Sequence, residues 1–344
     1  MTTGETFRAA LSTFGDGPVL IVSHNDADGL SAAAVLSRGL GRAGRPAQIR
    51  ILGRGETPWS DPIRAELMGR TIGGLVVADL GVRSGPIRPG VPTVVIDHHV
   101  PRGMPDDAVV ISGHGVVPEP TSSTLAHRAV AALAPAEDLV WLAGLGIAGD
   151  MADKAGLPEW DDARKRFGAT ALRAAATLVN QPRRSSRGDV TPALDLLLTA
   201  DGPKEIVSGD RPETRALIAA RDEVRAELER ARRVAPKLAG DVALILFSSG
   251  CQVHPLVAQA WAGRLKDRIV LAANAGFRPG WVHFAARTAL DVDLVAFLAE
   301  RAPPGADESY GSGHRKATGG ALRIADWNHF VAALGFGAAM TIGE

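Results

Sequence analysis

The chain has 344 residues, with 38 Lys and Arg against 38 Asp and Glu, so its formal net charge is zero. This balance argues against a protein that holds a long nucleic-acid duplex on a basic face, and the length favours two domains of ordinary size. Cys251 is the only cysteine, which excludes an internal disulfide and a zinc site built from several thiolates.

The sequence also lacks the signals of export and of membrane insertion. The N-terminus has neither the basic start nor the apolar stretch of a secretion signal, and no segment approaches the ~20 uninterrupted apolar residues of a membrane span. A single cysteine suits a reducing compartment. We therefore expect a cytoplasmic protein with no membrane partner.

Five short apolar runs in the first part of the chain predict five β-strands. They are continuous rather than alternating, which is typical of strands covered on both faces. An Ala-rich stretch that ends in glycines, at 31–44, predicts a helix between the first two runs. This order predicts right-handed crossovers and an α/β fold with a mostly parallel, doubly wound sheet. The runs occupy residues 18–23, 48–52, 74–78, 93–96 and 108–112.

The middle of the chain changes character. Residues 121–156 read as helices, and the Pro, Gly, Ser and Arg content of 181–192 is typical of a surface connection. A charged stretch at 209–236, with Pro212 in a first-turn position, predicts a connecting helix. Its apolar stripe consists of Leu217, Val224, Leu228 and Ala231.

A second, smaller α/β domain is predicted from residue 241 onward. We expect its strands and helices at 241–249, 254–265, 267–273, 281–286 and 291–301. The predicted division is a first domain at 1–185, a linker with the connecting helix at 186–236, and a second domain at 237–344.

Acids and histidines follow three of the predicted strands. The carboxyl ends of parallel strands lie at one edge of a sheet, where ligands bind in open α/β folds. The aspartate that closes the helical run LVWLAGLGIAGD can return to that edge. The residues are His24, Asp26 and Asp28 after the first run, Asp79 after the third, Asp97, His98 and His99 after the fourth, and Asp150.

Acids gathered on one edge repel one another, because each loses water and faces like charges. Divalent cations relieve this repulsion, and carboxylates with imidazoles but no sulfur favour Mn²⁺ or Mg²⁺. Two such ions bridged by one acid can generate a nucleophile and stabilise a phosphoryl displacement. For any one residue the ordinary alternative is a helix-capping or turn acid, or a satisfied histidine. Three such strand ends in one sheet favour the metal site.

Five motifs stand in order along the chain: SHNDADGLSAA, VVADLG, VVIDHHVP, GIAGDMAD and GSGHRKATGG. They resemble the motifs of DHH/DHHA1 family phosphoesterases, which include RecJ-type exonucleases and small oligoribonucleases. The resemblance implies a two-domain enzyme that uses two Mn²⁺ ions, with Mg²⁺ as an alternative, to hydrolyse phosphoester bonds. The first motif resembles the D-x-D-x-D-G of RecJ, with His24 in place of the first Asp.

Carried over by motif, the resemblance assigns ligands to two metal ions. His24 and Asp26 hold one ion. The other is held by Asp28, His98 and Asp150, and Asp79 bridges the pair.

The resemblance also implies the catalytic residues, which are Asp79, His98 and His99. His99 faces the substrate phosphate, whereas Asp97 orients a histidine and does not bind metal. The serine-rich helix start after Pro120 offers amides and hydroxyls that can hold a substrate anion. An equally favoured interpretation is that Ser122 and Ser123 are ordinary first-turn residues of a capped helix.

In the second domain, the glycine-rich segment 311–320 reads as a phosphate-binding loop. It resembles the family's GGGHxxAAG loop, which implies that Gly313, His314 and Arg315 contact the substrate. Arg287, just after a predicted strand, matches an arginine that the family aims at phosphate. A surface salt bridge is the commoner role for such an arginine.

We predict that the protein hydrolyses short oligonucleotides or small phosphorylated nucleotides to nucleoside monophosphates. Zero net charge and few aromatic residues disfavour a channel for long single strands. The alternatives are a RecJ-like single-stranded DNA exonuclease, a cyclic-dinucleotide phosphodiesterase, and a nucleotide sensor with an inactive metal site. The sequence leaves open whether the protein forms a homodimer.

Overall fold

The computed structural model describes residues 1–307 and 310–343, except for the side chain of Ser312. The chain divides into two compact units. The first comprises Met1–Arg183 and Gly188–Ala219, and the second comprises Arg184–Arg187 and Ala220–Glu344. Helix α10 (Pro212–Arg232), which the charged pattern predicted, contributes residues to both.

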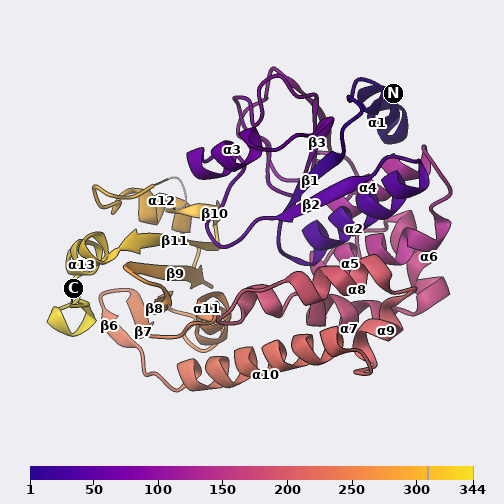
Figure 1. The fold of residues 1–344 in the computed structure, drawn as a ribbon. Helices are drawn as coiled ribbons and strands as arrows, with labels where there is room; N and C mark the ends of the chain where they lie inside the picture. Colours follow the sequence, from indigo (N-terminus) through magenta and orange to yellow (C-terminus); the bar gives the residue numbers. More distant parts are fainter. Residues whose placement is uncertain (308–309, 344) are drawn as a thin grey trace. The chain divides into compact units, whose positions relative to one another are not determined.

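Five parallel strands form the sheet of the first unit, in the order β2-β1-β3-β4-β5 (Figure 1). The predicted mostly parallel, doubly wound sheet is confirmed, and each predicted run matches its strand to within one residue at either end. The strands are β1 (Val19–Ser23), β2 (Ala47–Ile51), β3 (Gly74–Ala78), β4 (Thr93–Asp97) and β5 (Ala108–Ser112).

The three central strands are buried on both faces. Alternate residues of a strand point to opposite faces, and in β1 Val19 and Ile21 enter the large helical core, whereas Leu20 and Val22 enter a smaller one that includes Ile63 of α3 (Asp61–Met68). Strands β1, β3 and β4 are fully buried, as continuous apolar runs predict. The edge strands β2 and β5 are only partly buried, so the same prediction was wrong for them, because each has a neighbour on one side only.

The helices that precede α10 include the two that frame the carboxyl edge of this sheet, α2 and α4. The predicted helix at 31–44 begins earlier than expected, at Ala27, because Asp26 caps it. The helices are α1 (Thr3–Leu11), α2 (Ala27–Arg42), α3, α4 (Ser122–Ala131), α5 (Val140–Gly149), α6 (Pro158–Phe167), α7 (Ala169–Val179), α8 (Thr191–Thr199) and α9 (Pro203–Val207), with 3-10 turns η1 (Glu137–Leu139) and η2 (Pro182–Arg184).

Helices α2 and α4 lie side by side (Figure 1). Their close approach depends on Gly39 of α2, where an added Cβ would lie 2.4 Å from the Cβ of Val130 in α4. Both helices begin at the carboxyl edge of the sheet, so this contact fixes the N-terminus of one against that of the other.

The second unit is a smaller α/β unit, as predicted, with a six-stranded sheet in the order β10-β11-β9-β8-β7-β6. Only β7 and β8 pair in parallel. One face packs on α12 and α13, and the other on α10 and α11. The elements are β6 (Lys237–Ala239), β7 (Val242–Phe247), α11 (His254–Ala262), β8 (Ile269–Arg278), β9 (Trp281–Thr288), α12 (Leu294–Ala299), β10 (Ser312–His314), β11 (Ala317–Arg323), α13 (Ile324–Ala333) and the 3-10 turn η3 (Ala338–Met340).

Among the described residues, no helix combines the length and the apolar character that crossing a membrane requires.

The contact between α2 and α4 gives a stability prediction. Gly39→Ala should lower the free energy of unfolding by about 1–3 kcal/mol, because the new methyl group overpacks against Val130. Gly41→Ala in the same helix is the matched control: nothing lies within 4 Å of its added Cβ, so it should stabilise by roughly 0.5–1 kcal/mol. Urea unfolding of both variants measures the difference, and equal effects would contradict the packing argument.

Candidate metal centre

The polar residues that follow the central strands start from the same level of the sheet. Ser23 of β1, Ala78 of β3 and Ile96 of β4 are register partners. The residues that follow them are His24, Asp79 and Asp97. Strand order reverses between β1 and β3, because β2 adds on one side of β1 and β3 to β5 add on the other. Such a reversal opens the crevice in which ligands bind in open α/β sheets.

Asp79 adopts a backbone conformation that few residues other than glycine adopt, with a φ of 63°. A residue in this region costs about 1–3 kcal/mol and persists where its surroundings enforce it. Here the amide of Asp79 donates to the carbonyl of Ile96 at 3.0 Å, which ties the turn to β4. The turn buries the Asp79 side chain, only 2% exposed, beside the imidazoles of His24 and His98.

One group of potential ligands consists of His24, Asp26 and Asp79. The Nδ1 atom of His24 lies 3.0 Å from Oδ2 of Asp26 and 3.5 Å from Oδ2 of Asp79. Asp26 has a second role as the N-cap of α2, where its Oδ1 accepts the amide of Gly29 at 3.1 Å. Capping, the ordinary role of such an acid, therefore accounts for one oxygen and leaves the other facing His24.

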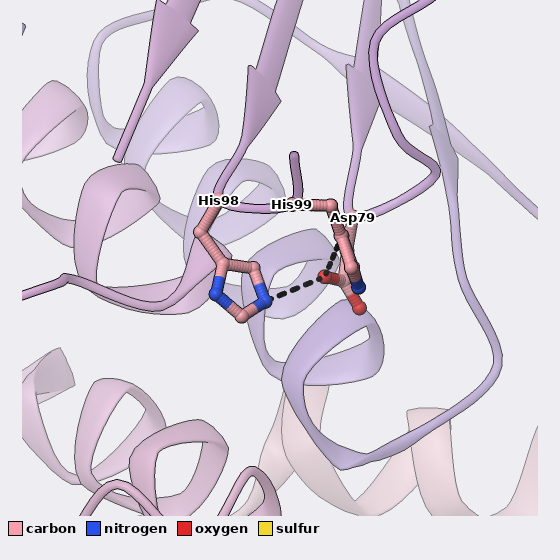
Figure 2. Close-up of side chains that lie close together, drawn as sticks. All are labelled: Asp79, His98 and His99. Carbon is pink, nitrogen blue, oxygen red and sulfur yellow. Dashed lines mark ion pairs between the residues drawn. The ribbon is translucent and has the colours of Figure 1, made fainter. Parts of the chain in front are cut away.

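A second group consists of Asp28, His98 and Asp150. Nε2 of His98 lies 3.2 Å from Oδ2 of Asp150, at the C-terminal end of α5, and 3.6 Å from Oδ1 of Asp79. Figure 2 marks the ion pairs of Asp79 with both histidines; Nδ1 of His99 lies 4.0 Å from the same Oδ1. Because Asp79 belongs to the first group and also contacts His98, it stands between the two groups.

The pKa values of the acids in these groups are shifted from their ordinary values. Burial and then the charge of Asp150 raise the pKa of Asp28 to about 7. Burial and the charges of Asp26 and Asp28 hold the pKa of Asp79 well above its ordinary value. Burial opposes the charged form of Asp26 too, but His24 and Arg183 outweigh it and lower its pKa.

Burial acts on the two histidines in the opposite direction, but their pKa values are also raised. Burial lowers the pKa of His24, but the neighbouring Asp26 and Asp79 raise it to about 10. Burial likewise lowers the pKa of His98, and Asp150 and Asp28 raise it to about 9. The cluster therefore holds protons where acids and imidazoles would otherwise have released them.

Ser122 and Ser123, at the start of α4, contact carboxylates. The amide of Ser122 donates to Oδ2 of Asp28 at 2.8 Å, and the amide of Ser123 donates to Oδ1 at 3.1 Å. The hydroxyl of Ser122 donates to Oδ1 of Asp79 at 2.9 Å. A helix N-terminus favours an anion through free amides and the helix dipole. Here the anion is Asp28 of the protein itself, and contact of these serines with substrate stays a prediction.

Asp97 is fully buried and is occupied by its neighbours. Its Oδ2 accepts the amide of Gly81 at 2.7 Å, and its Oδ1 accepts the amide of His99 at 2.7 Å. The same Oδ1 lies 3.2 Å from Nδ1 of His99. These contacts orient the His99 ring, which is the kind of role that the motif implied for Asp97.

The residues present fit a pair of hard divalent cations. Each group offers three ligand atoms within 4.8 Å of one another, and all are carboxylate oxygens or imidazole nitrogens, the donors that Mn²⁺ and Mg²⁺ accept. Oδ2 of Asp150 is buried and receives no hydrogen bond of good geometry from the described residues, so it has coordinating capacity to spare. Metal binding by these residues stays a prediction.

The predicted substrate residues of the second unit lie on one β-hairpin and on the strand beside it. The segment 311–320 is not a loop, as its glycines had suggested: β10 and β11 pair in antiparallel fashion. Gly313 has a φ of 141°, and an added Cβ would lie 2.6 Å from the carbonyl oxygen of Ala317, so the position requires glycine. His314 and Arg315 are exposed near the turn.

Arg287 lies in β9, next to this hairpin, and register pairs it with Ala317. Its Nη1 donates to the carbonyls of Ala286 and Thr318, at 2.8 and 3.2 Å, and burial lowers its pKa. The surface salt bridge that is common for such an arginine is not formed with any described residue. Phosphate binding by Arg287, Gly313, His314 and Arg315 stays a prediction.

Sequence reasoning missed two residues at the candidate metal centre. Asn180 accepts the amide of Ala27 at 2.9 Å, and Arg183 places Nη1 3.9 Å from Oδ2 of Asp26. Asn180 directly precedes the stretch 181–192 that was interpreted as a surface connection, and Arg183 lies in it. This interpretation was wrong for its start, where Pro182 is buried. The polar NQPRR after an apolar helix was the available signal.

No protein-family model and no curated protein matches the sequence. Solved structures do match. They include the exonuclease RecJ bound to manganese, with a TM-score of 0.68, 23% identity, and coverage of 97% of this chain and 93% of that chain. RecJ from Thermus thermophilus in complex with Mn²⁺ has a TM-score of 0.70, 21% identity, 96% coverage of this chain and only 54% of its own.

A further match is the DHH domain of a protein described as a member of a family of ribosomal proteins. It has a TM-score of 0.63 and 17% identity, with coverage of 96% of this chain and 88% of that chain. The two-domain fold that the motifs implied, that of DHH/DHHA1 phosphoesterases, is therefore the fold of this chain.

Ser122 gives a prediction on metal affinity. Ser122→Ala should weaken Mn²⁺ binding by about 10-fold or more, because a lost hydrogen bond to a ligand usually costs 10–100-fold. Ser31→Ala is the matched control: this serine is also fully buried, but its hydroxyl has no hydrogen-bond partner within the described part of the chain, so its removal should leave Mn²⁺ affinity unchanged. Titration followed by electron paramagnetic resonance of free Mn²⁺ measures both, and equal affinities would refute the role of Ser122.

The raised pKa values give a prediction on stability without metal. Between about pH 4 and 7, Asp28 holds a proton in the folded protein that the unfolded chain has released. His98 and His24 likewise hold such protons from about pH 6.5 up to about 9 and about 10, respectively. The stability that this cluster contributes therefore falls as pH rises. The melting temperature in a chelator should therefore fall from about pH 6 to about pH 9. His98→Gln should flatten this dependence; a dependence equal to that of the unmodified protein would contradict the assignment.

Proposed function

We propose that this chain, which has the fold of DHH/DHHA1 phosphoesterases, is a metal-dependent phosphodiesterase that releases nucleoside monophosphates from short oligonucleotides or small phosphorylated nucleotides. The observation that carries the proposal is the pair of ligand groups, His24, Asp26 and Asp79 on one side and Asp28, His98 and Asp150 on the other, with Asp79 in contact with both.

Two bound Mn²⁺ ions, with Mg²⁺ as the alternative, would supply Lewis-acid charge and an activated water for attack on phosphorus. The residues of the chain prepare the site for them. Asp79 joins the two ligand groups, and its strained turn and the Ser122 hydroxyl fix the direction of its carboxylate. Asp28 is held by two amides, so it need not reorganise when a cation binds.

His99 is the proposed contact to the substrate phosphate from this unit. Its Nδ1 lies against Asp97, which leaves Nε2 for a phosphoryl oxygen. Its side chain is 55% exposed, whereas that of His98 is 18% exposed. This difference supports a substrate role for His99 and a ligand role for His98. In the second unit, Arg287, Gly313, His314 and Arg315 are the proposed substrate residues.

Net charge supports short substrates over long ones. The chain is neutral overall, and binding of long strands normally rests on many Lys and Arg contacts to phosphates. The second candidate is a RecJ-like single-strand exonuclease, which the similarity to RecJ over 97% of this chain favours.

We place the activity in the cytoplasm, because a chain whose single cysteine is Cys251 forms no internal disulfide and suits a reducing compartment. A homodimer stays a prediction.

The substrate experiment separates the two candidates. Protein with Mn²⁺ is incubated with dinucleotides, phosphoadenosine phosphate, cyclic dinucleotides, and oligomers of about three and about fifty nucleotides at several salt concentrations. Faster turnover of the short substrates, with weak salt dependence, is expected. Preference for the long oligomer with steep salt dependence would favour the exonuclease, and nucleotide binding without any product would favour a sensor.

Asp79 gives the test of the metal mechanism. Asp79→Ala should reduce turnover by well over ~100-fold and weaken Mn²⁺ binding, because the lost group is a ligand and not merely a residue that supports one. Asp195→Ala is the control, since Asp195 is an exposed acid of α8. Hydrolysis by the Asp79 variant at the rate of the Asp195 variant would rule the mechanism out.

A further inference from the structure

Arg183 is a partly buried cation at the candidate metal centre, and it has few interaction partners among the described residues. Its side chain is 21% exposed, and its Nη1 lies 3.9 Å from Oδ2 of Asp26. This distance is well beyond the ~2.7–2.9 Å of a charge-assisted hydrogen bond. Its Nε is buried and has no hydrogen-bond partner among the described residues. The guanidinium therefore faces the centre with donors to spare.

Other arginines of the first unit are engaged by acids in a way that Arg183 is not. Arg128 binds both carboxylate oxygens of Glu159, at 2.7 and 3.0 Å. Arg50 binds Glu66 and Glu56 through several nitrogens. Those pairs explain their arginines as parts of the fold, whereas the long contact with Asp26 leaves Arg183 unexplained.

The backbone that carries Arg183 is fastened to the site. The residue lies in η2, just after α7, and Oδ1 of Asn180 in the same connection accepts the amide of Ala27 at 2.9 Å. Ala27 stands between the candidate ligands Asp26 and Asp28. The hydrogen bond therefore anchors the chain just before η2 against the turn that holds the candidate ligands, which keeps the backbone of Arg183 close to them.

Charge balance indicates what Arg183 would bind. The two ligand groups contain four carboxylates, those of Asp26, Asp28, Asp79 and Asp150, and two divalent cations carry four positive charges. The charges of these four carboxylates and the two ions then cancel, and Arg183 adds beside them a positive charge that can pair with the single negative charge of a phosphodiester. Once Asp26 binds a cation, its charge no longer holds the guanidinium, which is free to pair with a phosphate.

We propose that Arg183 binds non-bridging oxygens of the substrate phosphodiester, so that the first unit contributes an arginine to substrate recognition in addition to its metal ligands. This inference rests on the proposed function. The planar guanidinium matches two phosphate oxygens at once, which a lysine ammonium does not. Arg183 thereby selects phosphodiesters over neutral esters at this centre.

The test uses the full chain and two readouts that need no turnover. Inorganic phosphate binding to the Mn²⁺-loaded protein is measured by ³¹P relaxation, and Mn²⁺ affinity by electron paramagnetic resonance. Arg183→Met should weaken phosphate binding by about 10- to 100-fold, the usual loss for one charge-assisted hydrogen-bonding group. Its Mn²⁺ affinity should stay the same or rise, because a cation beside a ligand is removed.

Two further variants complete the experiment. Arg183→Lys keeps the charge but not the fork, so its phosphate affinity should be intermediate, and it also serves if the Met variant fails to fold. Arg164→Met is the control, because Arg164 of α6 forms an exposed pair with Asp161, and it should bind phosphate as the unmodified protein does.

Two results would overturn the inference. One is phosphate affinity in Arg183→Met equal to that of the Arg164 control. The other is a parallel loss of Mn²⁺ affinity, which would make Arg183 a residue that positions Asp26. Failure of the proposed function looks different: the unmodified protein would bind Mn²⁺ and phosphate but hydrolyse none of the substrates, and the phosphate affinities would still decide the role of Arg183.

Discussion

Mutual repulsion among buried carboxylates is the constraint around which the first unit is built. Parallel strands bring Asp26, Asp28 and Asp79 to one edge of the sheet, and the end of α5 adds Asp150. Burial removes the water that would solvate these charges, so each acid raises the energy of the others. Without cations, the cluster retains protons on Asp28 and on its histidines. With a proposed pair of divalent cations, the same carboxylates become ligands.

The surrounding fold keeps this unfavourable arrangement in place. Two amides at the start of α4 hold Asp28, and the Ser122 hydroxyl holds Asp79. These contacts depend on how α4 is placed against α2, which the Gly39 contact fixes. Close helix packing at one end of the pair thus supports charge placement at the other. A helix N-terminus that in other proteins binds a phosphate is used here to orient a side chain.

Similarity to RecJ concerns the fold, and the chemistry is inferred from the site. The ligand groups, the spare donors of Arg183 and the exposed ring of His99 are the observations that support the proposed phosphodiester substrate. The second unit presents Arg287 in a strand beside the glycine-containing hairpin β10–β11. Phosphate binding by the cationic residues of this unit stays a prediction.

The sequence by itself determined the five parallel strands and the candidate ligands, because both depend on local pattern. A continuous Val and Ile run predicts a buried strand, and an acid directly after such a run must lie at the carboxyl edge of the sheet. The hairpin at 311–320 was misjudged as a loop, since strand pairing with β9 is a long-range contact that overrides glycine's local preference. The tertiary structure alone decided the rest: the serines that hold Asp28, the left-handed turn at Asp79, and Arg183 beside Asp26. Each joins segments far apart in the chain, and no local pattern of residues records which distant groups packing will bring together.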